Sequence, residues 1–404
     1  MQPGEGELCR PLILVRKQNI FQMYSIFHLT TVHPRFDVRI FNNELKSLSN
    51  SFDDVNLVVA DGLGSSFLEN IKIHDLGKLS KSRFIRVMQG WWRSIIFFIR
   101  LRFMSNKTNI IHIHDPELLI FAVFAKLMGF YLIYDVHEDL PRQLSSKSWV
   151  NKKLLPVFVF FAETVLYCSR IFIDKYVCAT PVILAKFPIT KSILIRNLPR
   201  LEDFPFSGVS SISLNYKSDK YNICYIGSIS EARGIFTMLD ALLILNSAYD
   251  MSFMLQLAGP FVSLNLESQC KSHLGWKYVN YTSWADRADF YNLATTSICG
   301  ILPLFPYQNY IESLPNKLFE YMACGLPVVA SDFSTWRSWF SEFNCISYFS
   351  PQSSTSLAEA IYSLAKISGD IMSINARNSF VKGCNWSAES DRLTNLYGKI
   401  CDLH

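Results

Sequence analysis

The chain has 404 residues, half of them hydrophobic and 18% charged, with a formal net charge of +5. A chain of this length favours two domains over a single core. The modest charge argues against a dedicated nucleic-acid-binding protein, and it is compatible with contact at an anionic membrane surface. The ten cysteines include no Cys-x-x-Cys pair, which argues against a zinc ribbon and favours a reduced, cytosolic compartment.

No targeting or membrane-spanning segment is predicted. Residues 1–20 carry charges without a sufficient apolar run, unlike a secretory signal. A spanning helix needs about twenty predominantly apolar residues, and charged residues interrupt the two most apolar stretches, 117–134 and 155–173. We therefore expect a globular chain without a membrane span.

The N-terminal half alternates strands and helices. Residues 1–20 form an extension, and a first domain is expected at 21–199, with its first strand at 23–29. The polar loop 30–40 should face the ligand, because ligands bind at the carboxyl ends of parallel strands. The other strands predicted from apolar runs are 55–60, 110–114, 131–136, 170–173 and 192–196. The predicted helices are 81–104, 116–128, 151–168 and one that starts at Pro181 with Thr180 as its cap.

The helix predicted at 81–104 is both basic and aromatic. Tryptophan and phenylalanine among arginines suit a helix that lies against anionic lipid headgroups. The same pattern suits an amphipathic helix that packs on the sheet and leaves its arginines in solvent. On the first alternative, the aromatic residues Trp91, Trp92, Phe97 and Phe98 enter the interface, and the basic residues are Arg86, Arg93, Arg100 and Arg102.

A polar run follows the strand predicted at 131–136. Asp135, His137, Glu138 and Asp139 place four ionisable groups within five residues, and burying them all would be costly. The sequence therefore predicts that part of this run faces a ligand, with His137 as its strongest candidate. A histidine in such a place can also be structural.

The C-terminal half repeats the alternation after a linker. Residues 200–219 are rich in serine, proline and charge and form the predicted connection. A second domain is expected at 220–385, followed by a helix at 386–404. Its predicted strands are 221–226, 253–258 and 278–281, and a helix is predicted at 286–293. Residues 297–303 lead into the segment 312–320. The turn 227–234 contains Gly227 and Arg233 but matches neither a dinucleotide fingerprint nor a P-loop.

Residues 309–333 form a loop, a short helix, a sharp stop and a strand. Pro315 and Asn316 are expected to open the helix 316–324, and Gly325 suits the left-handed position just past its end. An apolar run then predicts a buried strand at 326–330. Two carboxylates bracket the loop, since Glu312 precedes it and Glu320 lies on the helix.

Alternating strands and helices without hairpin signals predict an α/β protein with two Rossmann-like parallel-sheet domains that face a cleft. Residues 309–333, together with 130–139 and 224–234, resemble GT-B glycosyltransferases, specifically the retaining group called glycosyltransferase family 4. The likeness is in the Glu-x7-Glu pair followed by Ala-Cys-Gly-Leu-Pro-Val. In this fold the last helix often crosses back onto the first domain.

The resemblance implies roles for individual residues. It places Glu312 and His137 near the donor sugar and gives Glu320 the ribose hydroxyls. Backbone amides of Asn316, Lys317 and Leu318 would face the diphosphate, where a helix N-terminus concentrates positive partial charge. The turn with Gly227 and Arg233 resembles the phosphate loop of the family, in which lysine is commoner than arginine, and Gly259 corresponds to a glycine near the nucleotide.

The resemblance also implies a function. The expected activity moves a sugar from a UDP- or GDP-sugar to a polyprenyl-linked or glycan acceptor during surface-polysaccharide biosynthesis, with retention of configuration. We expect no cofactor and no metal, because no Asp-x-Asp follows a strand and the sequence holds no His/Cys cluster. Arg233 and Lys317 would stabilise the departing diphosphate. The expected location is cytoplasmic, peripheral on the inner face of the plasma membrane. A nucleotide-sugar epimerase and a non-catalytic partner subunit are the alternatives.

Overall fold

The computed structural model describes residues 24–104, 107–137, 155–204, 220–283, 287–366 and 370–402. The chain forms two compact units. The first comprises residues up to Asn197 together with Glu389–His404, and the second comprises Leu198–Ala388. The predicted extension 1–20 and residues 205–219 of the predicted linker lie outside the described residues.

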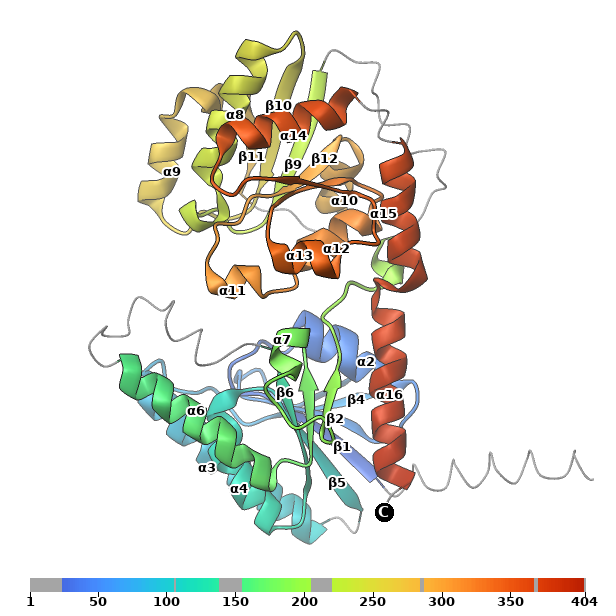
Figure 1. The fold of residues 1–404 in the computed structure, drawn as a ribbon. Coiled ribbons are helices and arrows are strands. Elements are labelled where there is room, and N and C mark those ends of the chain that lie inside the picture. The colour runs from blue at the N-terminus through green and yellow to red at the C-terminus, as the bar shows by residue number, and fades with distance from the viewer. Residues whose placement is uncertain are drawn as a thin grey trace, which may run out of the picture. The chain divides into compact units, whose positions relative to one another are not determined.

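The described part of the first unit is built on an eight-stranded sheet (Figure 1). The strand order is β3-β4-β2-β1-β5-β6-β7-β8, and every pairing is parallel except that of β3 with β4. The strands are β1 (Tyr24–Leu29), β2 (Val55–Val59), β3 (Ser66–Leu68), β4 (Ile71–Asp75), β5 (Thr108–Ile113), β6 (Tyr131–Val136), β7 (Lys175–Cys178) and β8 (Ser192–Leu194).

Helices cover both faces of this sheet. Since successive residues of a strand point to opposite faces, Phe27 and Leu29 of β1 pack into the core beneath α3, α4 and α6. His28 of the same strand points to the other face, where it contacts Tyr397 of α16. The helical segments are the π-helical η1 (Val38–Leu45), α2 (Lys46–Ser49), α3 (Arg83–Met104), the 3-10 turn η2 (Pro116–Leu118), α4 (Leu119–Leu127), α6 (Leu155–Phe172) and α7 (Pro181–Leu184).

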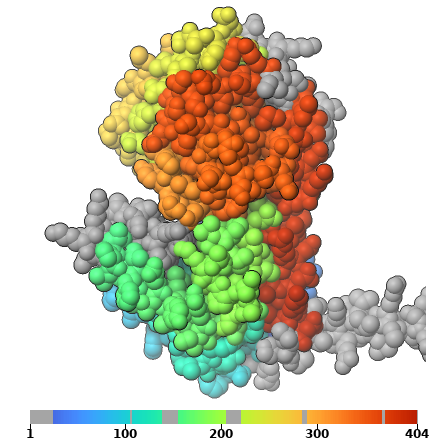
Figure 2. All heavy atoms as spheres, viewed as in Figure 1, coloured from blue at the N-terminus to red at the C-terminus, as the bar shows by residue number. Residues whose placement is uncertain are grey.

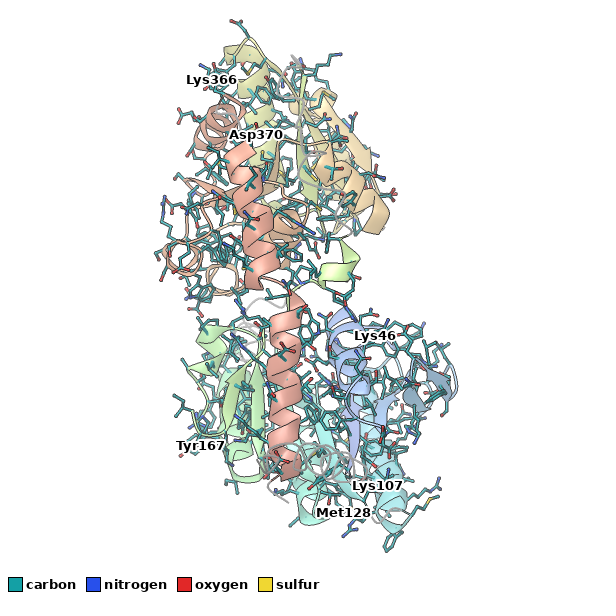
Figure 3. All side chains as sticks on the ribbon, turned by 90° about the vertical axis from the view of Figure 1, so that its right-hand side faces the viewer. Lys46, Lys107, Met128, Tyr167, Lys366 and Asp370 are labelled. Atoms are coloured by element: carbon teal, nitrogen blue, oxygen red, sulfur yellow. The ribbon has the colours of Figure 1, made fainter. Side chains whose placement is uncertain are left out.

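The helix α16 (Trp386–Asp402) starts in the second unit, and its residues from Glu389 onward belong to the first. Figure 3 shows α16 lying over the first sheet, with Lys46 of α2 beside it. The buried Glu389 carboxylate accepts hydrogen bonds from the Arg196 amide (2.9 Å) and the Arg196 Nε (2.8 Å). The Tyr24 hydroxyl donates to the Cys401 carbonyl at 3.1 Å. These bonds attach the last helix to the first unit.

The second unit contains a six-stranded parallel sheet in the order β11-β10-β9-β12-β13-β14. One core lies under α8 and α14, and a second core lies under α12 and α15. The strands are β9 (Lys220–Ile226), β10 (Ser252–Ala258), β11 (Val279–Thr282), β12 (Cys299–Leu302), β13 (Val328–Ser331) and β14 (Ile346–Phe349). The helices are α8 (Ile235–Ala248), α9 (Leu264–Lys271), α10 (Arg287–Thr295), α11 (Gln308–Ile311), α12 (Asn316–Ala323), α13 (Ser334–Trp339), α14 (Ser354–Lys366) and α15 (Asp370–Gly383).

The structure confirms the predicted α/β class and corrects several elements. The strand predicted at 170–173 is wrong, because α6 continues to Phe172 and the Ile173 amide still bonds the Ser169 carbonyl (2.8 Å). A short apolar run fits a helix as well as a strand, and the strand itself starts at Lys175. Segments that the sequence analysis did not predict include η1, α2, β3, β4, α9, α11, α13, β14, α14 and α15.

Two local predictions are confirmed. The Thr180 side chain accepts the Ile183 amide and caps α7, and Gly325 adopts a left-handed conformation with φ of +67°. Asn316 is not the cap of α12, because Pro315 occupies that position and Asn316 is the first helical residue.

Among the described residues, α6 is the one helix long and apolar enough to cross a membrane by length and composition. Its mean hydropathy is 1.5, and only 11% of it is buried. The sequence analysis expected no span here because Glu163 and Arg170 interrupt the run. In the fold, α6 is the crossover helix between the parallel strands β6 and β7, the usual position of a helix that covers a sheet.

Candidate functional site

Two glycines bring together the loops after β9 and β10 in the second unit. Gly227 and Gly259 have φ angles of +150° and +135°, which side chains with a Cβ rarely adopt. A Cβ on Gly259 would lie 2.1 Å from the Gly227 carbonyl oxygen. The close approach of the two backbones therefore requires glycine at position 259, and a polar backbone surface forms at the carboxyl ends of the strands.

Two cations converge on the Gly227 backbone. A Cβ built there would lie 3.5 Å from Arg233 Nη1 and 4.0 Å from Lys317 Cε. Burial works against the charge of Arg233, but the neighbouring Tyr225 and Tyr310 raise its pKa above the ordinary value. Arg233 therefore keeps its positive charge in a half-buried position.

The helix α12 supplies the second cation and a carboxylate. Lys317 Nζ lies 2.6 Å from Glu320 Oε2, and it also sits over the Phe290 ring, 4.9 Å from the ring centre. The side chains of Lys317 and Glu320 are 34% and 24% exposed, so a ligand can reach both. Asn316 is exposed at the start of the helix. Leu318 is a core residue, and its amide already donates to the Pro315 carbonyl. This amide is therefore not available to a ligand in the present structure.

Glu312 ends the short helix α11 and accepts a hydrogen bond from the Gln308 amide group. The next residue, Ser313, is tied to the core because its carbonyl accepts the Trp336 Nε1 proton at 3.0 Å. The two carboxylates of the Glu-x7-Glu pair therefore have different partners, Gln308 for Glu312 and Lys317 for Glu320.

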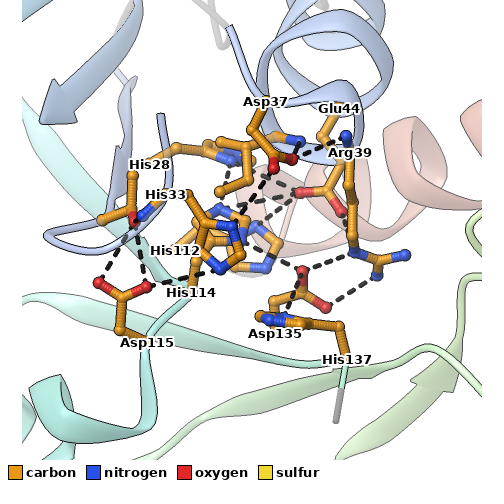
Figure 4. Close-up of polar contacts among 12 residues, drawn as sticks. His28, His33, Asp37, Arg39, Glu44, His112, His114, Asp115, Asp135 and His137 are labelled. Atoms are coloured by element: carbon orange, nitrogen blue, oxygen red, sulfur yellow. Dashed lines mark hydrogen bonds and ion pairs between the residues drawn. The ribbon is translucent and has the colours of Figure 1, made fainter. Parts of the chain in front are cut away.

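In the first unit, His137 directly follows β6 and is partly exposed (Figure 4). Its Nδ1 lies 3.8 Å from Asp135 Oδ2. The fully buried Asp135 accepts two hydrogen bonds from Arg39 (2.7 and 2.8 Å) and one from His114 Nδ1 (3.1 Å). Burial alone would raise the pKa of Asp135, but the Arg39 charge holds it well below its usual range. Glu138 and Asp139 lie outside the described residues.

A second histidine, His33, lies beside His137, with 5.1 Å between the ring centres. His33 Nδ1 is 3.3 Å from Asp37 Oδ2, and His33 Nε2 is 3.8 Å from Asp115 Oδ1. The hydrogen bond to Asp37 raises the pKa of His33 despite partial burial. Burial opposes ionisation of Asp37, but bonds from His33 and the Ile40 amide lower its pKa to about 2.

Asp115, after β5, fixes the loop after β1 because it accepts the Thr30 and Thr31 hydroxyls, each at 3.0 Å. The sequence analysis assigned the loop 30–40 to the ligand side but singled out neither His33 nor Asp115. The available signal was their position in the segments that follow two predicted strands, 23–29 and 110–114.

The two sets of residues suit different chemistry. In the second unit, two cations beside a helix N-terminus favour a bound anion such as a diphosphate. In the first unit, two histidines backed by carboxylates present imidazole nitrogens that can donate and accept hydrogen bonds.

The comparisons with known proteins agree with this fold. Residues 210–381 match the family model of glycosyl transferases group 1. The structure is similar to sucrose-phosphate synthase from Thermosynechococcus elongatus, with a TM-score of 0.71, 13% identity, and coverage of 95% of this chain and 100% of that one. It is similar to HepE from Anabaena in complex with UDP, with a TM-score of 0.67, 12% identity, and coverage of 93% and 100%. No curated protein is significantly similar in sequence.

A third similar structure is WaaG, a glycosyltransferase involved in lipopolysaccharide biosynthesis, with a TM-score of 0.65, 12% identity, and coverage of 91% of this chain and 98% of that one. The fold is that of the GT-B glycosyltransferases. The residues that match glycosyl transferases group 1 lie in the second unit.

Proposed function

We propose that the protein transfers a sugar from a nucleotide-diphosphate sugar, such as a UDP- or GDP-sugar, to a lipid-linked or oligosaccharide acceptor. The observation that carries this proposal is the convergence of Arg233 and Lys317 on Gly227. Such a site suits a diphosphate, because guanidinium can engage two oxygens at once and ammonium acts as a point charge. Two of the similar HepE structures hold UDP and UDP-glucose, which supports the same ligand class.

The proposed chemistry needs no metal ion at the diphosphate and retains the anomeric configuration. The bond between the anomeric carbon and the diphosphate oxygen breaks, and an acceptor hydroxyl oxygen forms the new bond on the same face. Its proton passes to the departing phosphate. Arg233, Lys317 and the first amides of α12 meet the negative charge that grows on the leaving group, which is often the largest catalytic contribution. His137 and Glu312 are proposed near the transferred sugar.

Glu320 gives the first test, because its carboxylate is proposed to bind the ribose hydroxyls by charge-assisted hydrogen bonds. UDP- and GDP-sugars should raise the Tm of the wild-type chain, since a ligand that binds only the folded state stabilises it. In Glu320→Gln, donor affinity should fall by about 1.5–3 kcal/mol, which is roughly 10- to 150-fold. Thermal shift and titration calorimetry measure both quantities.

Glu359→Gln is the matched control, because Glu359 is an exposed glutamate on α14 of the same unit. Unchanged donor affinity in Glu320→Gln would remove the ribose assignment. No stabilisation of wild type by any nucleotide sugar would remove the donor class. Turnover of the donor without an acceptor would indicate the epimerase alternative.

We further propose that the acceptor belongs to surface-polysaccharide biosynthesis and that the protein works in the cytoplasm, bound peripherally to the inner face of the plasma membrane. The observation behind this is an apolar surface on α3, α4 and α6. These helices cover one face of the first sheet (Figure 1) and lie at the surface of the first unit (Figure 2). The exposed residues of the apolar surface include Phe84, Trp92, Phe103, Val123, Leu127, Phe160, Phe161 and Ile171. We call this set the apolar face. Exposed apolar patches of this kind mark interaction sites.

Charge favours an anionic lipid as the partner of the apolar face. The helix α3 contains five arginines and no acidic residue. The structure changes the residues expected in the interface, because Phe98 is fully buried and Arg93 donates to the carbonyls of Leu76 and Lys78. We therefore propose that the exposed phenylalanines of α6, in place of Phe98, enter the membrane interface.

The wild-type chain should sediment with vesicles that contain phosphatidylglycerol at low salt, and less so at high salt. The double variant Phe160→Asp/Phe161→Asp should lose this binding, because it places charge on the apolar face. Leu264→Asp is the control, since Leu264 is 85% exposed in the second unit. Failure of wild type to bind anionic vesicles at low salt would leave the membrane proposal without support.

A further inference from the structure

Four fully buried polar side chains meet on the face of the first sheet that α16 covers (Figure 4). They are His28 of β1, His112 at the paired position of β5, His114 just after β5, and Glu44 of η1. The sequence analysis saw no histidine cluster, because these residues are up to 86 positions apart in the chain. The pairing of β1 with β5 brings them together.

The spacing of these groups suits a single bound ion. One ligand atom from each of the four lies within 4.8 Å of all the others. His28 Nδ1 lies 2.9 Å from His114 Nε2 and 3.6 Å from Glu44 Oε2. Glu44 Oε2 lies 3.9 Å from His114 Nε2 and 4.0 Å from His112 Nδ1. Zinc bonds of about 2.0–2.1 Å in a tetrahedron separate the ligand atoms by roughly 3.3–3.4 Å, so small shifts suffice.

The outer atoms of three groups already have the partners that orient metal ligands. His114 Nδ1 donates to Asp135 at 3.1 Å, which leaves Nε2 facing the centre of the cluster. His28 Nε2 bonds the Tyr397 hydroxyl at 3.2 Å, which leaves Nδ1 facing the centre. Glu44 Oε1 pairs with Arg39 Nε at 3.1 Å. Carboxylate–histidine pairs of this kind fix the tautomer and orientation of metal-binding imidazoles.

The charges also leave room for a cation. Two fully buried carboxylates, Glu44 and Asp135, share the single guanidinium of Arg39. Asp135 accepts both of the short hydrogen bonds that Arg39 donates to a carboxylate. Among the described residues, Glu44 Oε2 accepts no hydrogen bond. Burial, reinforced by Asp135, raises the pKa of Glu44. Burial lowers the pKa of His28, His112 and His114.

We propose that His28, His112, His114 and Glu44 form a closed site for a divalent transition-metal ion of the zinc class. Three imidazoles and a carboxylate match the ligand preference of zinc, and four protein ligands make the site structural. Binding replaces the hydrogen bond between His28 and His114. It also replaces the hydrogen bond between His112 Nδ1 and the Tyr397 hydroxyl (2.9 Å), and that hydroxyl keeps its bond to His28 Nε2. The ion would join β1, β5 and η1.

The test uses the full chain freed of metal by a chelator under mild denaturation and then refolded. One equivalent of Zn²⁺ should bind tightly and raise the Tm, and elemental analysis of protein purified without added metal should find about one ion per chain. Co²⁺ in place of Zn²⁺ should give the visible absorption of a tetrahedral N/O site. In His28→Gln and His112→Gln, metal affinity should fall by at least 100-fold.

His74→Gln is the matched control, because His74 is a partly buried histidine of the same sheet that bonds Asn56. It should keep wild-type metal binding. If a variant does not fold, the Co²⁺ spectrum and the metal content of wild type still decide the question. A wild-type chain without stoichiometric metal, and with no Tm increase from Zn²⁺, Mn²⁺ or Co²⁺ beyond that of Mg²⁺, would overturn the proposal and identify a hydrogen-bonded network with a protonated Glu44.

Discussion

Replacing Arg233 with alanine is expected to lower kcat by roughly 30- to 1000-fold, which corresponds to about 2–4 kcal/mol of lost transition-state stabilisation. The guanidinium lies against the Gly227 backbone, and Tyr225 and Tyr310 keep it charged. The charge on a leaving diphosphate grows as the sugar departs, so the cation gains most in the transition state. Donor affinity should therefore fall less than turnover does. Steady-state kinetics with the donor identified by thermal shift measures both.

Two variants control this experiment. Arg337→Ala removes an exposed arginine of α13 that pairs with Asp332 in the same unit, and it should leave kcat unchanged. Arg233→Lys keeps the charge without the two-pronged geometry and should recover part of the activity. Equal losses of donor affinity and turnover in Arg233→Ala would make Arg233 a plain binding residue.

The sequence predicted the two parallel-sheet domains because the central strands are short apolar runs and several helices have a start or stop signal. Thr180 and Gly325 are such signals, and both are used as expected. The donor-side residues were also within reach of sequence reasoning, since Gly227, Gly259 and Lys317 follow strands or open a helix. Their roles in donor binding were implied by the family resemblance, and their positions after strands or at a helix start agree with those roles.

Long-range pairings were beyond that reasoning. His112 contacts Tyr397, 285 residues away, and Arg39 reaches Asp135 across 96 residues. No local period signals such contacts, because they depend on strand order and on the helix that covers the sheet. One sign was present, since His112 alternates with buried isoleucines in β5. A polar residue at a buried strand position needs a partner.

The strand predicted at 170–173 failed for a related reason. The run Ile171–Ile173 is apolar whichever element it joins, and its neighbours in sequence decide the matter. Here α6 packs against α4 and remains helical as far as Phe172. The exposure of α6 likewise could not be inferred, because an apolar helix is normally expected to be covered.

Replacing Asp135 is expected to have the second large effect, a loss of stability of the first unit. The variant Asp135→Ala should destabilise the first unit by about 3–5 kcal/mol, the usual result of removing one partner from a buried ion pair. The substitution leaves the Arg39 guanidinium buried with Glu44 as its remaining carboxylate contact among those described, and it removes the acceptor of His114 Nδ1. Urea denaturation followed by circular dichroism, with hydrogen exchange of peptides from β1, β5 and β6, measures the loss and locates it.

Asp174→Ala is the matched control, because Asp174 also ends a turn beside this sheet and bonds Lys126 and the Leu132 amide. Its side chain is 22% exposed and that of Lys126 is 38% exposed, so water replaces the lost contact and the cost should be nearer 1 kcal/mol. Donor binding should survive Asp135→Ala under conditions where the chain is folded, because the donor residues belong to the second unit. A loss of stability no larger than that of Asp174→Ala would mean that Arg39 finds another partner, and the buried network would not hold the first unit together.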